Sequence, residues 1–328
     1  MPDTPYTGLL CIGDPHLASR VPGFRKDDYP RTILNKLRWA LDYARTNDLV
    51  PVILGDLFHY PQDNANWLLV QLLDLFKSPI LAVPGNHDCN ENTLTENDTL
   101  SILSAAGHIR LLNQHGPWTG VMNDTPVTIG GSAWSDRLPK SIDLSAPSTQ
   151  HPVLSTQHSP VTTSLVFWIA HHDIRFPGYE DAGRFGCFEI PGVNVLINGH
   201  IHRRLQDVVC GCTTWLNPGN ITRVSRSDGS RNRKPSVLRI DVAGGQWSKQ
   251  IIEVPHQPFD EVFHPEIVSA DVKIDDSLFI RGLAQLESLK TSSGAGLRAF
   301  LADNLHQFEE PVANEIRALA EEVLENGD

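Results

Sequence analysis

The chain has 328 residues, which is long enough for one large domain with a smaller addition. Its formal charge of −12 disfavours nonspecific binding of nucleic acid over the whole surface, and 40% hydrophobic residues suffice for a sizeable core. Five scattered cysteines disfavour a disulfide framework, and we expect neither a secretory leader nor a membrane span. Together these features predict a cytoplasmic protein.

The N-terminal half alternates between short apolar runs and amphipathic segments. Strands are predicted at 8–12, 49–54 and 79–83, because each of these runs is apolar and bounded by turn residues. Between them, apolar residues spaced three and four apart predict helices at 31–46 and 65–76. This alternation predicts βαβ units and a mainly parallel sheet.

The second half contains a long break in this pattern. Residues 136–163 are rich in Pro, Ser, Thr and Gln, which predicts an exposed loop. Strands resume at 164–170 and 193–198, and three later apolar runs are spaced like antiparallel strands. The composition changes after Pro255, so we expect a main domain of residues 1–255 and a small segment of residues 256–328.

Polar side chains recur where the predicted strands end. Asp14 and His16 follow the first strand, Asp56 follows the second, and Asn86 and His87 follow the third. The later strands are followed by His171 and His172, and by His200 and His202. Because the loops at the carboxyl ends of parallel strands converge on one crevice, we expect these residues to meet. Each cluster alone is ordinary turn chemistry, but five such turns together are not expected by chance.

The donor types predict a class of metal. Imidazole, carboxylate and amide groups without cysteine are typical of sites for Mn²⁺, Fe²⁺ or Zn²⁺. There are more donors than one ion needs, which predicts two cations that share a carboxylate. The residues alone do not distinguish His171 from His172 as a ligand.

The motifs D-x-H, GD, GNHD, H and GHxH resemble those of the calcineurin-like metallophosphoesterase superfamily. The resemblance implies an α/β fold, a four-layer α/β/β/α sandwich, here with a small C-terminal α+β appendage. It implies a catalytic role for His87, which would stabilise the transition state or protonate the leaving oxygen as water attacks phosphorus, and it places Asp88 beside His87 among the catalytic residues. The implied ligands are Asp14, His16, Asp56 and His202 for one ion, and Asp56, Asn86, His171 and His200 for the other. The implied cofactor is a pair of divalent ions, with Mn²⁺ the first choice.

Three further segments are similar to DNA double-strand-break repair nucleases of the SbcD and meiotic-recombination type. They are GDLFHYP at 55–61, the stretch 99–113, and the stretch 197–226 with its NPGN turn. This resemblance implies that His59 partners His87, and that the chain is a DNA exo- or endonuclease subunit of an SbcCD-like repair complex. It also implies an SbcC-like ATPase partner and a homodimer. The 136–163 insertion and the short segment after residue 256 depart from that family.

A basic segment follows the last metal motif. Between residues 203 and 234 there are seven basic and two acidic residues, a local charge of +5 in an acidic chain. A segment of this charge is typical of a surface that follows phosphates, whereas a merely solvated loop is the alternative. The residues predicted to contact DNA phosphate are Arg203, Arg204, Arg223 and Arg226.

Two other functions stay open at this stage. Because fold and metals do not name the substrate, a small-molecule phosphodiesterase or phosphatase is the main alternative. A non-catalytic scaffold is the second alternative, and the complete set of ligand residues disfavours it.

Overall fold

The computed structural model describes most of the chain, namely residues 6–143, 164–179, 183, 185–226, 228–264, 312–314 and 316–317. The chain divides into two units, Met1–Pro265 and Glu266–Asp328. In the second unit, residues 312–314 and 316–317 are helical. The rest of that unit, and most of the predicted loop at 136–163, lie outside the described residues. The domain boundary near residue 256 and the α+β appendage therefore stay predictions.

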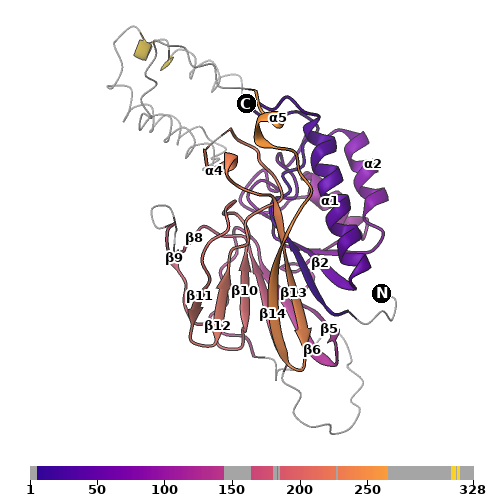
Figure 1. The fold of residues 1–328 in the computed structure, drawn as a ribbon, viewed down its shortest axis with the longest axis vertical. Helices are drawn as coiled ribbons and strands as arrows, with labels where there is room; N and C mark the ends of the chain where they lie inside the picture. Colours follow the sequence, from indigo (N-terminus) through magenta and orange to yellow (C-terminus); the bar gives the residue numbers. More distant parts are fainter. Residues whose placement is uncertain are drawn as a thin grey trace. The chain divides into compact units, whose positions relative to one another are not determined.

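The first unit is built on two six-stranded sheets (Figure 1). The first sheet has the strand order β14-β13-β1-β2-β3-β4. Its strands β1 to β4 run parallel, as the βαβ pattern predicts, and the antiparallel hairpin of β13 and β14 extends the sheet beside β1. The strands are β1 (Gly8–Ile12), β2 (Leu49–Ile53), β3 (Ile80–Ala82), β4 (Ile109–Leu111), β13 (Ser236–Ala243) and β14 (Gln246–Glu253).

Three helices connect the parallel strands of this sheet and cover its outer face. They are α1 (Tyr29–Thr46), α2 (Asn66–Leu75) and α3 (Thr99–Ala105). Helix α1 begins after Asp28, whose side chain accepts a hydrogen bond from the backbone N–H of Arg31. Its apolar face packs on Leu10 and Ile12 of β1 in one core. Because successive strand residues point to opposite faces, Leu9 and Cys11 lie in a second core between the sheets.

The second sheet has the strand order β11-β12-β10-β7-β6-β5. The hairpin of β5 and β6 was not predicted from the sequence, and Asn123 and Asp124 form its turn at positive φ, 43° and 62°. The strands are β5 (Trp118–Met122), β6 (Thr125–Ser132), β7 (Leu165–Ala170), β10 (Val195–Asn198), β11 (Val208–Cys210) and β12 (Thr213–Leu216).

The outer face of the second sheet carries a third core. There, Val166 and Trp215 pack against residues that flank β8 (Ile174–Arg175) and β9 (Phe185–Gly186). The remaining helices of the first unit are single turns, α4 (Asp228–Arg231) and α5 (Phe259–Val262). The predicted α/β sandwich of two large sheets flanked by helices is confirmed.

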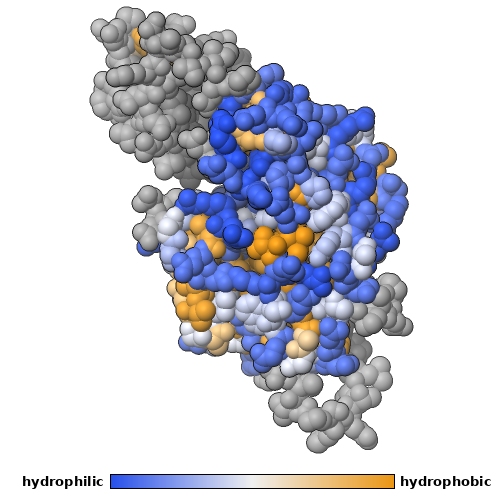
Figure 2. All heavy atoms as spheres, viewed as in Figure 1, coloured by the Kyte–Doolittle hydropathy of each residue, from blue (hydrophilic) through white to orange (hydrophobic). Residues whose placement is uncertain are grey.

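Exposed side chains are mostly polar. Figure 2 shows that the face carrying β13 and β14 is largely hydrophilic, with hydrophobic residues in separate small areas. An exception elsewhere is α2, on which Trp67, Val70 and Leu73 are 44%, 59% and 36% exposed. Among the described residues, no helix is both long and apolar enough to cross a membrane.

Candidate metal centre

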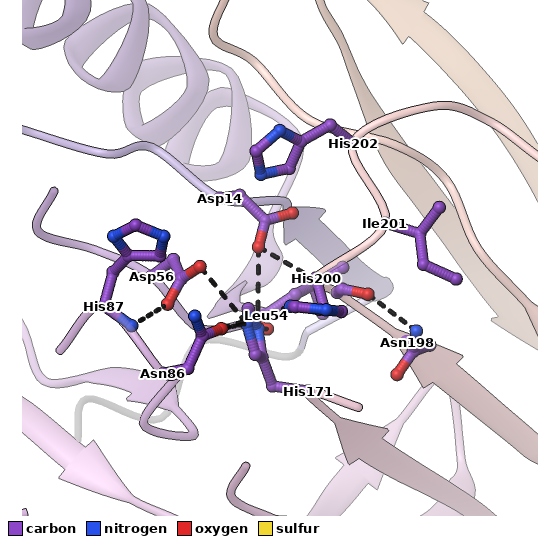
Figure 3. A network of polar contacts seen from close by, with 12 residues as sticks. Asp14, Leu54, Asp56, Asn86, His87, His171, Asn198, His200, Ile201 and His202 are labelled. Carbon is purple, nitrogen blue, oxygen red and sulfur yellow. Dashed lines mark hydrogen bonds and ion pairs between the residues drawn. The ribbon is translucent and has the colours of Figure 1, made fainter. Parts of the chain in front are cut away.

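The turns after five strands bring the predicted donor residues together. Asp14 follows β1, Asp56 follows β2 and Asn86 follows β3, while His171 and His200 follow β7 and β10 of the other sheet. Figure 3 shows these side chains converging from both sheets, with His202 above them and His87 at the left. The pattern that predicted the site was the recurrence of ligand residues at strand ends, and the parallel strand arrangement supplies the reason for their convergence.

Four of these residues have left-handed backbone conformations. The φ angles are 35° at Asp14, 46° at His16, 47° at Asp56 and 67° at His200. Residues other than glycine rarely adopt such angles, and each costs on the order of 1–3 kcal/mol. Strain of this kind persists where the surrounding structure enforces it, and it gathers at functional sites.

Gly85 allows the GNHD turn to approach Asp56 closely. A Cβ atom at residue 85 would lie 2.1 Å from Oδ1 of Asp56, so no other residue fits without displacing that carboxylate. The approach lets the backbone N–H of His87 donate a hydrogen bond of 2.8 Å to the same oxygen. One carboxylate oxygen of Asp56 is thereby held by the backbone, and Oδ2 is left to face the other predicted metal ligands.

The first donor cluster comprises Asp14, His16, Asp56 and His202, whose donor atoms all lie within 4.8 Å of one another. Nε2 of His16 faces Nε2 of His202 at 2.9 Å. Asp14 is fully buried, and its Oδ2 has no hydrogen-bond partner. A buried carboxylate oxygen without a partner costs free energy, and a cation at this position would satisfy it. The cluster therefore fits a divalent metal.

The second donor cluster comprises Asp56, His171 and His200, within the same 4.8 Å limit. Oδ1 of Asn86 adds a neutral oxygen, 3.2 Å from Nε2 of His171 and 3.1 Å from Nδ1 of His200. His171 donates from Nδ1 to the carbonyl oxygen of Leu54 at 2.7 Å, which turns Nε2 toward the cluster. Asp56 belongs to both clusters, so the arrangement fits two cations that share one carboxylate.

His172, the alternative to His171, faces away from this centre. Its backbone N–H donates to Oδ1 of Asn198 at 3.0 Å, and its ring meets Phe185 edge-on at 5.8 Å between centroids. The structure therefore brings His171, and not His172, to the donor clusters.

Burial and mutual charge set the protonation of the centre. Burial raises the pKa of Asp14 to about 7 and lowers that of His202 to about 3. For Asp56, burial acts to raise the pKa, but the charges of His171, His87 and His16 and the hydrogen bond from His171 together hold the pKa well below its ordinary value. Burial likewise acts to lower the pKa of His171, but Asp56 raises it to about 9. A cation bound here would displace the proton that His171 holds beside Asp56, because metals bind deprotonated ligands.

His87 lies beside the first cluster and is contacted by His59. Nδ1 of His87 is 2.9 Å from the backbone carbonyl oxygen of His59, and the two rings stack with centroids 5.3 Å apart. The ring of His16 meets His87 edge-on at 4.8 Å. The structure thus brings together His59 and His87 as the sequence predicts, with the hydrogen bond made by the backbone of His59.

Asp88 was placed among the catalytic residues, but the structure does not bring it to the donor clusters. It is fully buried, and it accepts hydrogen bonds from the backbone N–H groups of Gly85, Leu57 and Phe58. These bonds tie the GNHD turn to the turn after β2. Asp88 is therefore corrected to a positioning residue, because its oxygens are used by the backbone.

The structure adds positioning residues that the sequence analysis missed. Asn198 and Asn217 are buried at the ends of β10 and β12 and bond to each other at 3.0 Å. Asn217 also donates to the carbonyl oxygens of Ile201 and Arg203, so the pair shapes the loop that carries His202. The available signal was asparagine at two further strand ends, in LING and LNPG.

An aromatic residue also borders the centre. Trp134, which follows β6, lies against the ring of His200 with 4.6 Å between centroids. It is half-buried, and it closes the side of the second cluster. The sequence offered only the end of an unpredicted strand as a signal for this residue.

The four predicted phosphate-contacting arginines do not form one surface. Arg203 and Arg204 are exposed directly after His202. Arg223 is only 5% exposed, and its guanidinium donates to the carbonyl oxygens of Arg233 and Gln257. Arg226 is half-buried, with its guanidinium 4.1 Å from the ring centroid of Phe24. A phosphate-contacting role for Arg223 is therefore corrected to a structural one, since it is buried and each of its three guanidinium nitrogens already donates to a backbone carbonyl oxygen.

Comparisons with known proteins identify relatives of this chain. The profile of the family described as Calcineurin-like phosphoesterase matches residues 8–204. The 3',5'-cyclic adenosine monophosphate phosphodiesterase CpdA of Haemophilus influenzae is 24% identical over 224 residues, 66% of this chain and 77% of that protein.

Two solved structures from Thermus thermophilus were also matched. A hypothetical protein aligns over 75% of this chain and 99% of its own, with 12% identity and a TM-score of 0.40. The sulfate thiohydrolase SoxB aligns over 78% of this chain and 59% of its own, with 11% identity and a TM-score of 0.39.

Proposed function

The chain belongs to the calcineurin-like phosphoesterase family, and from that premise we propose that it hydrolyses phosphodiester bonds with two divalent cations. The observation that carries this proposal is the position of Asp56 in both donor clusters. One cation would be held by Asp14, His16, Asp56 and His202, and the other by Asp56, Asn86, His171 and His200.

The cations would supply Lewis-acid chemistry, which makes water more acidic and offsets the charge of the phosphoryl oxygens. The chain supplies the proton at the leaving oxygen. His87 donates its Nδ1 hydrogen to the carbonyl oxygen of His59, so its Nε2 is the atom that can hold a proton and give it up. Asp88 keeps the turn that carries His87 in place.

We propose Mn²⁺ as the metal, with Fe²⁺ and Zn²⁺ as the alternatives. The support is the donor set, which combines imidazoles, carboxylates and one amide oxygen and includes no thiolate. Activity measured with Mn²⁺, Fe²⁺, Zn²⁺ and Mg²⁺ in turn, after removal of bound metal by a chelator, tests this choice. Highest activity with any ion other than Mn²⁺ would contradict it.

The substrate class has two candidates. The similarity to a protein named as a cyclic-AMP phosphodiesterase supports a small phosphodiester better than it supports DNA. A DNA exo- or endonuclease is the second candidate, and the exposed Arg203 and Arg204 beside His202 favour it. The complete donor set disfavours a non-catalytic scaffold.

A direct assay separates these candidates. Purified protein with Mn²⁺ is given bis-p-nitrophenyl phosphate, cyclic AMP, and single- and double-stranded DNA in parallel. Cleavage of the small esters alone supports the first candidate, and metal-dependent cleavage of DNA supports the second. Failure to hydrolyse any of the four with any ion of the series overturns the proposed function.

We propose that the protein forms a homodimer and, for the nuclease candidate, that it binds an SbcC-like ATPase partner. The apolar side chains exposed on α2, Trp67, Val70 and Leu73, support a protein contact on that helix. Light scattering on the wild type and on a Val70→Asp variant tests the dimer, which the introduced charge should weaken.

A further inference from the structure

A basic pocket lies next to the candidate metal centre. It has a volume of about 540 Å³, and residues that follow His202, the turn after β12 and the ends of β13 and β14 line it. Gly219 and Asn220 in that turn lie against the backbone beside the metal ligands, since the carbonyl oxygen of Gly13 accepts from the N–H of Ile221 at 3.1 Å. Its polar lining includes Arg203, Arg204, Asn220, Arg233, Lys234 and Glu253.

Asn220 lines this pocket with an unpartnered side chain. It is 1% exposed, and neither its amide nitrogen nor its amide oxygen has a hydrogen-bond partner. Leaving such groups unpaired is unfavourable, so their presence at a pocket indicates a polar ligand. Because its hydrogens are donors, the amide nitrogen suits an anion, and the amide oxygen can accept from a water molecule that accompanies it.

Arg233 is held in place by two backbone contacts, and its Nε is left without a partner. Its Nη1 and Nη2 donate to the carbonyl oxygens of His202 and Thr222, while its Nε has no partner. The same guanidinium therefore joins the pocket to the backbone of a metal ligand.

The charge of the pocket is positive. Arg203, Arg204, Arg233 and Lys234 contribute four positive charges, and Glu253, 3.0 Å from Lys234, contributes one negative charge. The sum is +3. Arg204 is exposed, and the structure gives it no hydrogen bond or ion pair with any described residue, so its guanidinium is available to a ligand.

We propose that this pocket binds a second, non-scissile phosphate of the substrate while the phosphate to be cleaved lies at the metal centre. The proposal rests on the proposed phosphodiesterase function and names its substrate class, a nucleotide with at least two phosphates. The second phosphate can be the next one along a nucleic-acid strand or the terminal phosphate of a short nucleotide. An ester with a single phosphate leaves the pocket unused.

The experiment compares four substrates in Mn²⁺. They are bis-p-nitrophenyl phosphate, the dinucleotide TpT with one phosphate, pTpT with an added terminal phosphate, and TpTpT with two internal phosphates. For the wild type we expect kcat/KM to be at least about tenfold higher for a two-phosphate substrate than for TpT, mainly through KM. A higher kcat/KM for pTpT alone would identify the ligand of the pocket as a terminal phosphate. A higher kcat/KM for TpTpT would identify it as the next phosphate of a nucleic-acid strand.

The informative quantity is the ratio of kcat/KM for a two-phosphate substrate to kcat/KM for TpT. The variants Asn220→Leu and Arg204→Glu should each reduce this ratio toward one. Because the ratio is taken within one protein, damage to the metal centre cancels, and the exposed Arg204 provides a variant whose fold is not at issue. Arg231→Glu is the matched control, since Arg231 is an exposed arginine of the same basic segment that pairs with Asp260 instead of lining the pocket.

Failure of the pocket proposal can be told apart from failure of the proposed function. A wild-type ratio near one, or a ratio that survives in both pocket variants, overturns the pocket proposal while hydrolysis of bis-p-nitrophenyl phosphate keeps the proposed function. No hydrolysis of any of these four substrates with any of the ions tested counts against the proposed function itself, and not against the pocket alone.

Discussion

Nδ1 of His87 lies 2.9 Å from the backbone carbonyl oxygen of His59. A carbonyl oxygen only accepts hydrogen bonds, so Nδ1 carries the hydrogen in either protonation state of the ring. The contact therefore fixes the tautomer of His87 and directs Nε2 as the atom that exchanges protons. The hydrogen bond to His87 is therefore made by the backbone of His59, beside which the two rings stack.

We expect His87→Ala to lower kcat by about 100- to 10 000-fold, because the proton donor at the leaving oxygen is lost. KM and bound metal should stay close to wild type. His59→Ala is the matched comparison, and it should cost less, since the backbone carbonyl remains when the ring is removed. Steady-state kinetics and metal analysis measure both. Equal losses in the two variants, or loss of metal from His87→Ala, would contradict this assignment.

Asp56→Asn should weaken both metal sites together. Oδ2 of Asp56 lies 3.2 Å from Nε2 of His171 and 3.7 Å from Nε2 of His16, so the same oxygen faces both clusters. An amide has no negative charge to offset two cations, and we expect at least about a tenfold loss of Mn²⁺ affinity at each site. Calorimetric titration of Mn²⁺ measures this, with the exposed Asp63→Asn as control. Retention of one site at full affinity would show that Asp56 is not shared.

The donor set was predictable because it follows a rule of chain geometry. Ligand residues such as Asp14 and His200 stand directly after strands, and parallel strands end at one edge of a sheet. The role of Asp88 was not predictable in this way. It belongs to the same motif as His87, but only the structure shows that backbone N–H groups of Gly85 and Phe58 use its oxygens.

The missed parts share a different cause. The β5–β6 hairpin interrupts its apolar residues with Pro126 and two glycines, which hide the alternation of a strand. The burial of Arg223 was hidden because a charged side chain in a basic segment is normally exposed, and its partners are carbonyl oxygens far along the chain. The pairing of Asn198 with Asn217 is likewise a contact between strands, which spacing along the sequence does not reveal.

Asp88→Asn should destabilise the fold by about 1–3 kcal/mol. An asparagine has a single acceptor oxygen, whereas the carboxylate of Asp88 accepts from three backbone N–H groups at 2.9, 2.9 and 3.3 Å. The amide N–H groups of an asparagine at residue 88 would also face these backbone N–H groups, which are donors themselves. Urea denaturation measures the change, and Asp74→Asn on exposed α2 should stay within about 0.5 kcal/mol of wild type. Unchanged stability in Asp88→Asn would contradict the positioning role.

Lys36 gives the fold a pH dependence of its own. This lysine of α1 is 6% exposed, and its Nζ donates to the carbonyl oxygen of Ile221 at 2.9 Å. Burial lowers the pKa of Lys36 from 10.5 to about 7, and the charges of Arg25 and Arg223 add to this effect. Below pH 7 the folded protein holds a buried ammonium group at Lys36, which lowers the free energy of unfolding.

Between pH 7 and 10 the unfolded chain keeps its proton on Lys36 while the folded chain releases it. Because the unfolded state then binds more protons, the free energy of unfolding rises with pH through this group, by up to about 1.4 kcal/mol per pH unit. In Lys36→Met this contribution is absent. We therefore expect the stability of the wild type relative to Lys36→Met to increase steadily from pH 7 to 10 in urea denaturation. Lys77→Met, at an exposed lysine just after α2, is the matched control for removal of a lysine charge. A flat difference between wild type and Lys36→Met would mean that Lys36 keeps an ordinary pKa in the fold.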